Sequence, residues 1–196
     1  MIRAFTLLIV LIILSVSQIG EAKKVEEKND NIYLSFYKKT VSELLPEYRL
    51  HDEEDYQSYW KHKNSYVYKT KDDEGNYKAP YWTKGFFNED ETIDFAYILI
   101  NKQNNKKYLF AIVSEGEKYK AIQLGEGNNL EMGIATQQKG KILTASGKGY
   151  WEPTKDDPPE VFVKRNAVSY FMFESAASLF IWNEKDRNFK RHWISD

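Results

Sequence analysis

Apolar side chains are distributed along this chain in three patterns, and each pattern predicts a different kind of segment. Residues 1–22 form a nearly continuous apolar run behind one basic residue, Arg3, and end in the small-residue sequence Gly20-Glu21-Ala22. This order is typical of a secretory signal peptide, because the apolar run is shorter than the ~20 residues that a membrane span needs. We therefore expect cleavage after Ala22.

The second pattern is mixed and predicts a small helical part. Residues 23–31 are charged with almost no apolar content, which is typical of a flexible lead-in. Apolar residues then recur at spacings of three and four, as on one face of a helix: Leu34, Tyr37, Val41, Leu44 and Leu45. Pro46 should end this helix. A second short helix is predicted from the acidic run 52–55 onward, and a turn is predicted at 74–76.

The third pattern covers the rest of the chain, where runs rich in β-branched and aromatic residues alternate with polar turns. The clearest run is 93–101, and a polar turn at 102–107 separates it from its expected antiparallel partner, 108–114. Further strands are predicted at 118–124, 133–136, 141–145, 161–164, 167–173, 178–182 and 189–194, with a loop at 125–129. The predicted fold is mainly β, an antiparallel meander sheet or open barrel with a small helical N-terminal part, in a single domain over 32–196.

Composition narrows the functional classes. The chain has 28 basic and 29 acidic side chains and a net charge of −1, so no basic excess favours a nucleic-acid partner. Cysteine is absent, which excludes disulfides, thiolate metal sites, a cysteine nucleophile and a lipid-modified cysteine after the signal peptide. We therefore expect a periplasmic or secreted protein with no stable membrane anchor after signal cleavage.

The most informative chemical motif lies at 86–94. Oxygen-bearing side chains alternate there, at a spacing that can surround Ca²⁺: Asn88, Asp90, Thr92 and Asp94. An EF-hand-like loop would have Asp at its first position and Gly at its sixth, where this chain has Phe86 and Glu91. These departures remove charge and strain the turn. We therefore expect a polar turn without a cofactor, in which Asp94 accepts hydrogen bonds, and Ca²⁺ binding is the disfavoured alternative.

No catalytic constellation is complete in the sequence. The histidines share no metal-ligand spacing, and no G-x-S-x-G motif supplies a serine nucleophile. Glu174 lies in an apolar stretch, where burial would raise the pKa of its carboxyl group and suit it to act as an acid. A carboxylate that accepts hydrogen bonds at a strand end is the favoured interpretation of Glu174.

One long loop, 147–160, suggests a binding surface. It contains three prolines and the aromatic pair Tyr150 and Trp151. Loops of this length are often functional, and exposed aromatic side chains suit carbohydrate or protein surfaces. Tyr150 and Trp151 are therefore the predicted binding residues.

The segment 85–96 reads GFFNEDETIDFA, and further motifs stand at 147–150 (GKGY), 173–182 (FESAASLFIW) and 193–196 (WISD). As a set, they resemble a group of exported bacterial proteins of uncharacterised function. The β core of those proteins carries a G-D-x-N-x-D-G-x-x-D-[YF]-A loop, similar to the calcium loops of FG-GAP propeller repeats. The resemblance covers about residues 80–196 and implies an exported single-domain β protein, with no established activity.

These observations favour one functional hypothesis and leave two alternatives. The favoured hypothesis is an exported, non-enzymatic binding protein, such as a periplasmic inhibitor or immunity-type protein that neutralises an exported enzyme or toxin. The first alternative is a carboxylate-based hydrolase acting on cell-envelope material. The second is a structural module of the envelope.

Overall fold

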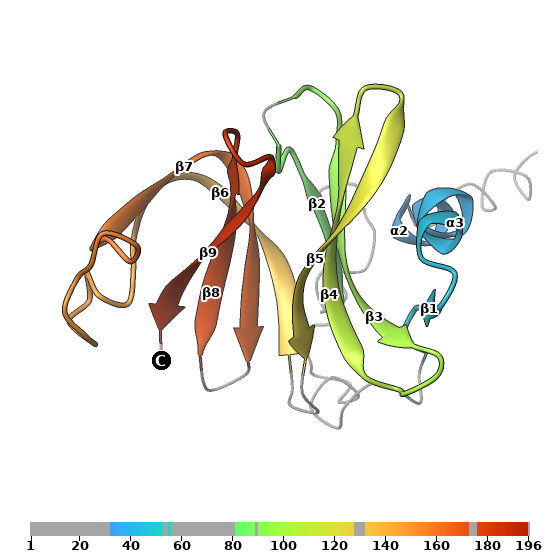
Figure 1. The fold of residues 1–196 in the computed structure, drawn as a ribbon, viewed down its shortest axis with the longest axis horizontal. Helices are drawn as coiled ribbons and strands as arrows, with labels where there is room; N and C mark the ends of the chain where they lie inside the picture. Colours follow the sequence, from blue (N-terminus) through green and yellow to red (C-terminus); the bar gives the residue numbers. More distant parts are fainter. Residues whose placement is uncertain are drawn as a thin grey trace, which may run out of the picture.

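The computed structural model describes residues 32–52, 55, 81–88, 90–127, 132–172 and 176–195. The expected signal peptide, the lead-in, the turn at 74–76 and Glu174 lie outside these ranges, as does the second helix apart from residues 52 and 55. The described chain forms two antiparallel sheets and a short helical segment (Figure 1). The predicted fold class, mainly β with a small helical N-terminal part, is confirmed. Among the described residues, no helix has the length and apolar character needed to cross a membrane.

The first helix is confirmed, but only part of its predicted apolar face is buried: Val41 and Leu45 lie in the core and Tyr37 packs against it. Three consecutive elements form it: α2 (Ile32–Phe36), the π-helical η1 (Tyr37–Val41) and α3 (Ser42–Leu44). Tyr33 and Val41 are buried, whereas Leu34 and Leu44 are 41% and 39% exposed. A π-helical turn is wider than an α-helical one, so a spacing of three and four residues does not follow one face through it.

The first sheet has β3 (Asp94–Asn101) and β4 (Lys107–Glu115) at its centre. These strands pair as predicted, and β5 (Lys118–Gly127) adds to the other side of β4. β5 therefore includes residues that were predicted to lie in the loop 125–129. Two strands that the sequence did not predict, β1 (Tyr48–Arg49) and β2 (Trp82–Gly85), pair with β3. Both are too short to show a period of two residues.

The second sheet has the order β6 (Met132–Leu143), β7 (Glu160–Met172), β8 (Ala177–Asn183) and β9 (Asn188–Ser195). The predicted strands 133–136 and 141–145 belong to one strand, β6, which ends before residues 144 and 145. The predicted strands 161–164 and 167–173, as far as the structure describes the latter, are likewise one strand, β7. A β-bulge between Gln138 and Gly140 shifts the register of β6 against β7 within a polar stretch, and both strands continue beyond it.

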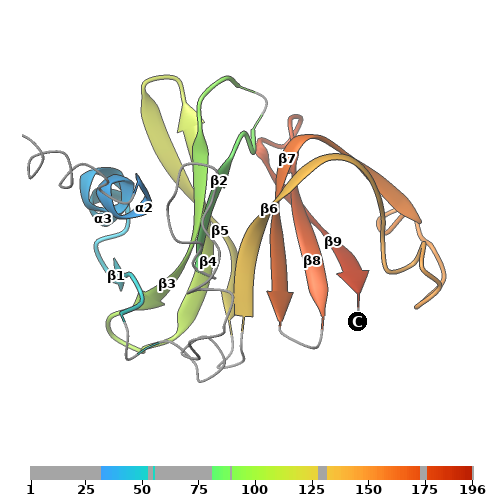
Figure 2. The same ribbon diagram turned by 180° about the vertical axis from the view of Figure 1, so that it is seen from behind.

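The main core lies between the two sheets. It is one cluster of buried side chains from both sheets. The first sheet and the segments beside it contribute Tyr81, Phe87, Ala96, Ile98 and Leu109, and the second sheet contributes Met132, Ile134, Val168 and Phe180. A second core lies on the other face of the first sheet, where Phe36 of the helical segment stacks on Phe95 with ring centroids 3.8 Å apart. The helical segment and the second sheet therefore cover opposite sides of the first sheet, as Figure 2 also shows.

Candidate functional site

The loop 86–94 is organised around the carboxylate of Asp94, the first residue of β3. Asp94 is fully buried, and the backbone N–H groups of Phe87 and Asn88 donate to its Oδ2 at 2.8 and 2.9 Å. The backbone N–H of Ser114 donates to its Oδ1 at 2.8 Å. The prediction that Asp94 accepts hydrogen bonds in this turn is therefore confirmed. Burial raises the pKa of Asp94 above its ordinary value, although the three backbone donors oppose this effect.

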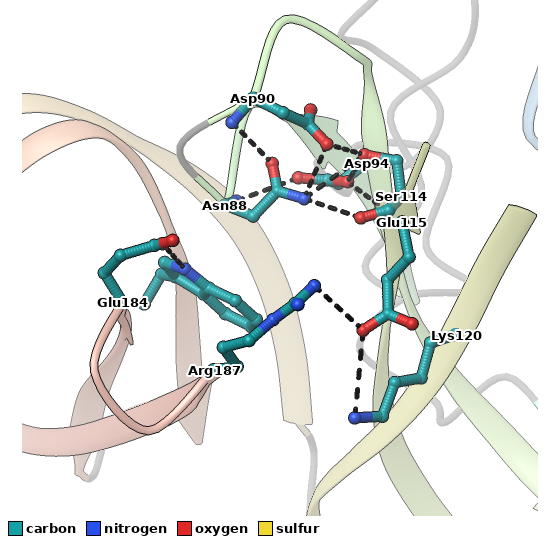
Figure 3. A network of polar contacts seen from close by, with 9 residues as sticks. Asn88, Asp90, Asp94, Ser114, Glu115, Lys120, Glu184 and Arg187 are labelled. Atoms are coloured by element: carbon teal, nitrogen blue, oxygen red, sulfur yellow. Dashed lines mark hydrogen bonds and ion pairs between the residues drawn. The ribbon is translucent and has the colours of Figure 1, made fainter. Parts of the chain in front are cut away.

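A second set of hydrogen bonds joins the loop to Ser114 on β4 (Figure 3). The side-chain amide of Asn88 donates to Oδ2 of Asp90 at 3.0 Å and to the backbone oxygen of Ser114 at 2.9 Å. Ser114 Oγ donates to Asp90 Oδ2 at 2.5 Å, and the backbone N–H of Thr92 donates to Asp90 Oδ1 at 2.7 Å. Burial disfavours ionisation of Asp90, but these donors outweigh it and lower the pKa of Asp90 below its ordinary value.

Three of the four candidate calcium ligands thus have side chains in one network: Asn88, Asp90 and Asp94. The carboxylates of Asp90 and Asp94 already accept hydrogen bonds from nitrogen and hydroxyl donors, while Thr92 contributes a backbone N–H and is exposed. Among the residues that the structure describes, no three His, Cys, Asp or Glu side chains are grouped to hold a metal ion. Weak or absent Ca²⁺ binding stays a prediction.

Arg165 of β7 attaches this loop to the second sheet. One guanidinium nitrogen donates to the backbone oxygen of Asp90, and the other lies 2.5 Å from Glu91 Oε1. The guanidinium also lies over the ring of Phe86, 5.6 Å from its centroid. Phe86 therefore contributes to the contact between the sheets. The sequence did not predict this role, because Arg165 and the loop are more than 70 residues apart.

A cleft of about 500 Å³ opens beside this network, between the β4–β5 turn and the β8–β9 turn. Its lining residues are Asn88, Asp90, Ser114, Glu115, Gly116, Trp182, Glu184 and Arg187. Across the cleft, Arg187 Nη2 lies 3.3 Å from Glu115 Oε1. On the same side as Glu115, Lys120 Nζ of β5 lies 4.0 Å from that oxygen (Figure 3). The sequence did not predict a binding role for Trp182, the last residue of the 173–182 motif, or for Arg187, which belongs to no motif.

The predicted binding residues Tyr150 and Trp151 lie in the connection between β6 and β7, and they differ in exposure. Tyr150 is 54% exposed, whereas Trp151 is half-buried and its indole N–H donates to Asp157 Oδ2. The hydroxyl of Thr144 donates to the backbone oxygen of Pro158 at 2.6 Å. Trp151 therefore acts as an internal brace of this connection, and Tyr150 is the residue that it presents to solvent.

A small apolar surface lies where β6 ends and β7 begins, next to this connection. We call Leu143, Tyr150 and Phe162 the hairpin-end surface; they are 51%, 54% and 65% exposed. Leu143 and Phe162 lie on the same face of the β6–β7 pair, because Leu143 pairs with Glu160 and Lys141 pairs with Phe162. The sequence missed Leu143 and Phe162 as surface residues because both belong to β-forming runs.

Comparisons of the chain with family models, with curated proteins and with solved structures found no match.

Proposed function

We propose that this chain is an exported, non-enzymatic binding protein that recognises another exported protein, in the manner of a periplasmic inhibitor or immunity-type protein. One observation carries the proposal. The hairpin-end surface has three large apolar side chains, each at least half exposed. Leu143 and Phe162 share one face of the β6–β7 pair, and the backbone N–H of Tyr150 donates to the oxygen of Ala145, two residues after Leu143. Grouped apolar and aromatic residues of this kind are typical of the centre of a protein interface.

The surroundings of the hairpin-end surface fit a protein partner. Lys141 Nζ and Glu160 Oε2 form an ion pair of 2.6 Å on the same face, which provides the polar rim expected around an apolar centre. The connection that carries Tyr150 is fixed to β9 by a hydrogen bond of 2.8 Å from Ala145 N–H to the backbone oxygen of Trp193. A braced loop loses little conformational entropy on binding, which favours affinity.

The buried carboxylates support a binding role over catalysis. Asp94 is fully buried and accepts three backbone hydrogen bonds, so its oxygens are not accessible to a substrate. The second candidate is a carboxylate-based hydrolase of cell-envelope material, because Asp90, Glu115 and Glu184 line one cleft. A hydrolase would release soluble fragments from purified peptidoglycan and lose this activity in Glu184→Gln. The proposed function predicts no release by the wild-type protein.

Site-specific photocrosslinking in the native host tests the proposal. A photoreactive phenylalanine analogue at position 162 should give a covalent adduct with one exported protein, identified by mass spectrometry and then purified. The purified protein should form a stoichiometric complex with the wild-type chain. The same analogue at Leu44, which is 39% exposed on α3, is the control. Equal adducts at positions 162 and 44, or no adduct with an exported protein at 162, would contradict the proposal.

A further inference from the structure

We propose that the cleft between the β4–β5 and β8–β9 turns binds a neutral saccharide. The cleft and the hairpin-end surface share no residue, so this inference goes beyond the proposed function and is tested without the protein partner. Its volume of about 500 Å³ lies within the range of about 300–1,000 Å³ that is usual for small-molecule sites.

An oriented aromatic ring forms one wall of the cleft. Trp182 Nε1 donates to Glu184 Oε2 at 2.6 Å, and the ring packs edge-on against Phe189 with centroids 5.3 Å apart. These two contacts hold the indole in place. Trp182 is only half-buried and also lines two neighbouring cavities. A held, accessible indole offers a flat apolar surface against which the C–H face of a sugar ring can stack.

The polar groups of the cleft suit a ligand that both donates and accepts hydrogen bonds. Glu115 and Glu184 supply carboxylate acceptors from opposite walls, and the guanidinium of Arg187 supplies donors beside them. The ion pair and the indole contact use only part of this capacity, because a carboxylate has about four acceptor sites and a guanidinium has five donors. Neighbouring hydroxyl groups of a sugar match such an alternation of acceptors and donors.

Charge argues against an acidic ligand. Three carboxylates and one guanidinium line the cleft: Asp90, Glu115, Glu184 and Arg187. The excess of negative charge repels phosphate and carboxylate groups. Arg187 and Lys120 both lie within 4.0 Å of Glu115 and compensate part of that charge, which weakens the attraction for a cation. A neutral, hydroxyl-rich ligand fits best.

The wall opposite Trp182 is preformed. Asn88 and Ser114 are buried, at 7% and 2% exposure, and each is held by hydrogen bonds to its neighbours in the loop network. Because these groups are already ordered, binding does not require them to lose conformational freedom.

Calorimetric titration of the wild-type protein with cellohexaose, chitohexaose and maltohexaose tests the inference. We expect at least one of these neutral oligosaccharides to bind, and a hexamer of galacturonic acid to bind at least tenfold more weakly. Trp182→Ala should weaken the binding at least tenfold, whereas Trp182→Phe should retain most of it. The Leu143→Gln protein should bind the saccharide as the wild type does, because Leu143 lines neither the cleft nor the two cavities beside Trp182. This control separates the site from the hairpin-end surface.

Arg187→Ala provides a second test that does not depend on removal of a large side chain. Its side chain is 64% exposed, so the variant should fold normally and bind the saccharide several-fold more weakly. Lys185→Ala, in the same turn but outside the cleft lining, is the matched control and should bind normally. No binding of any neutral oligosaccharide, preferential binding of the acidic one, or equal affinity in wild type and Arg187→Ala would overturn the inference.

Discussion

At the scale of single residues, Asp94 has the clearest structural role. Asp94→Ala would leave the backbone N–H groups of Phe87, Asn88 and Ser114 without their acceptor in a buried site. Each unsatisfied buried donor costs about 1–3 kcal/mol, so we expect a loss of about 3 kcal/mol or more in the free energy of unfolding, measured by urea denaturation. Asp156→Ala, at an exposed position, should change it by less than about 0.5 kcal/mol. A similar small change in Asp94→Ala would contradict this role.

The same network underlies the prediction for calcium. A site that binds Ca²⁺ only in the folded state gains about 2.7 kcal/mol of stability at a free concentration 100-fold above Kd. Because the carboxylates of Asp90 and Asp94 already accept several hydrogen bonds, we expect no such gain. A thermal unfolding scan at millimolar Ca²⁺ should match one with a chelator. A large upward shift that disappears in Asp90→Ala would show that the loop binds the ion.

His51 gives a prediction about pH. The ring is buried and stacks on Tyr81 with centroids 3.6 Å apart, and burial, aided by the charge of Lys107, lowers the pKa of His51 to about 3. The folded protein therefore keeps His51 neutral, and the stability that this provides is present above pH 6.5 and lost as the pH falls towards 3. Between pH 7 and pH 5, the loss should be about 2 kcal/mol.

The control for this effect is His51→Phe, which retains an aromatic ring against Tyr81. Its free energy of unfolding should depend less on pH between 7 and 5 than that of the wild type, in urea titrations at both pH values. His192, whose pKa is also lowered by burial, is present in both proteins, so its contribution cancels in the difference. Equal pH dependence in the two proteins would contradict the assignment.

At the scale of elements, the β6–β7 connection is tightly packed at Gly147. A Cβ atom at Gly147 would lie 1.7 Å from the backbone oxygen of Pro159, which cannot move without disturbing the connection. Gly147→Ala should therefore lower the free energy of unfolding by about 1–3 kcal/mol. Gly125→Ala on β5, where a Cβ meets no atom within 4 Å, is the control and should change it much less. Equal melting temperatures of the two variants would argue against a tightly packed connection.

Local patterns in the sequence were sufficient to predict most strands, but not their continuity or their neighbours. The runs at 93–101 and 108–114 carry enough β-forming residues to be recognised alone. β6 and β7 were each split in the prediction, because polar residues near the bulge at Gln138 interrupt the apolar alternation. Only pairing between distant segments shows that the strands continue.

In the candidate sites too, contacts between residues close in sequence were predictable and contacts between distant residues were not. The role of Asp94 was predictable, because the polar turn and the strand that it begins are adjacent in sequence. The bracing role of Trp151 depends on Asp157, and the cleft brings Trp182 and Glu115 together from different sheets. These contacts arise from tertiary structure, so no single segment of the sequence indicates them.

At the scale of the whole molecule, the proposed binding of an exported protein requires that this chain be exported as well. Mass spectrometry of the protein from its native host should show a chain that begins at Lys23, because signal peptidases cleave after small residues such as Ala22. The mature protein should be recovered from the periplasm or the medium. An intact N-terminus at Met1 in the membrane fraction would contradict export by cleavage.

The central claim is that the hairpin-end surface binds an exported protein. Its most direct test is the affinity of the purified crosslinked partner for the wild-type protein, Phe162→Gln and Leu44→Gln, measured by isothermal titration calorimetry. Loss of a large, central apolar contact typically costs more than 1 kcal/mol of binding free energy, so Phe162→Gln should raise Kd about tenfold or more. Leu44→Gln should leave Kd within about twofold of the wild type. Equal Kd values for the wild type and Phe162→Gln would contradict the claim.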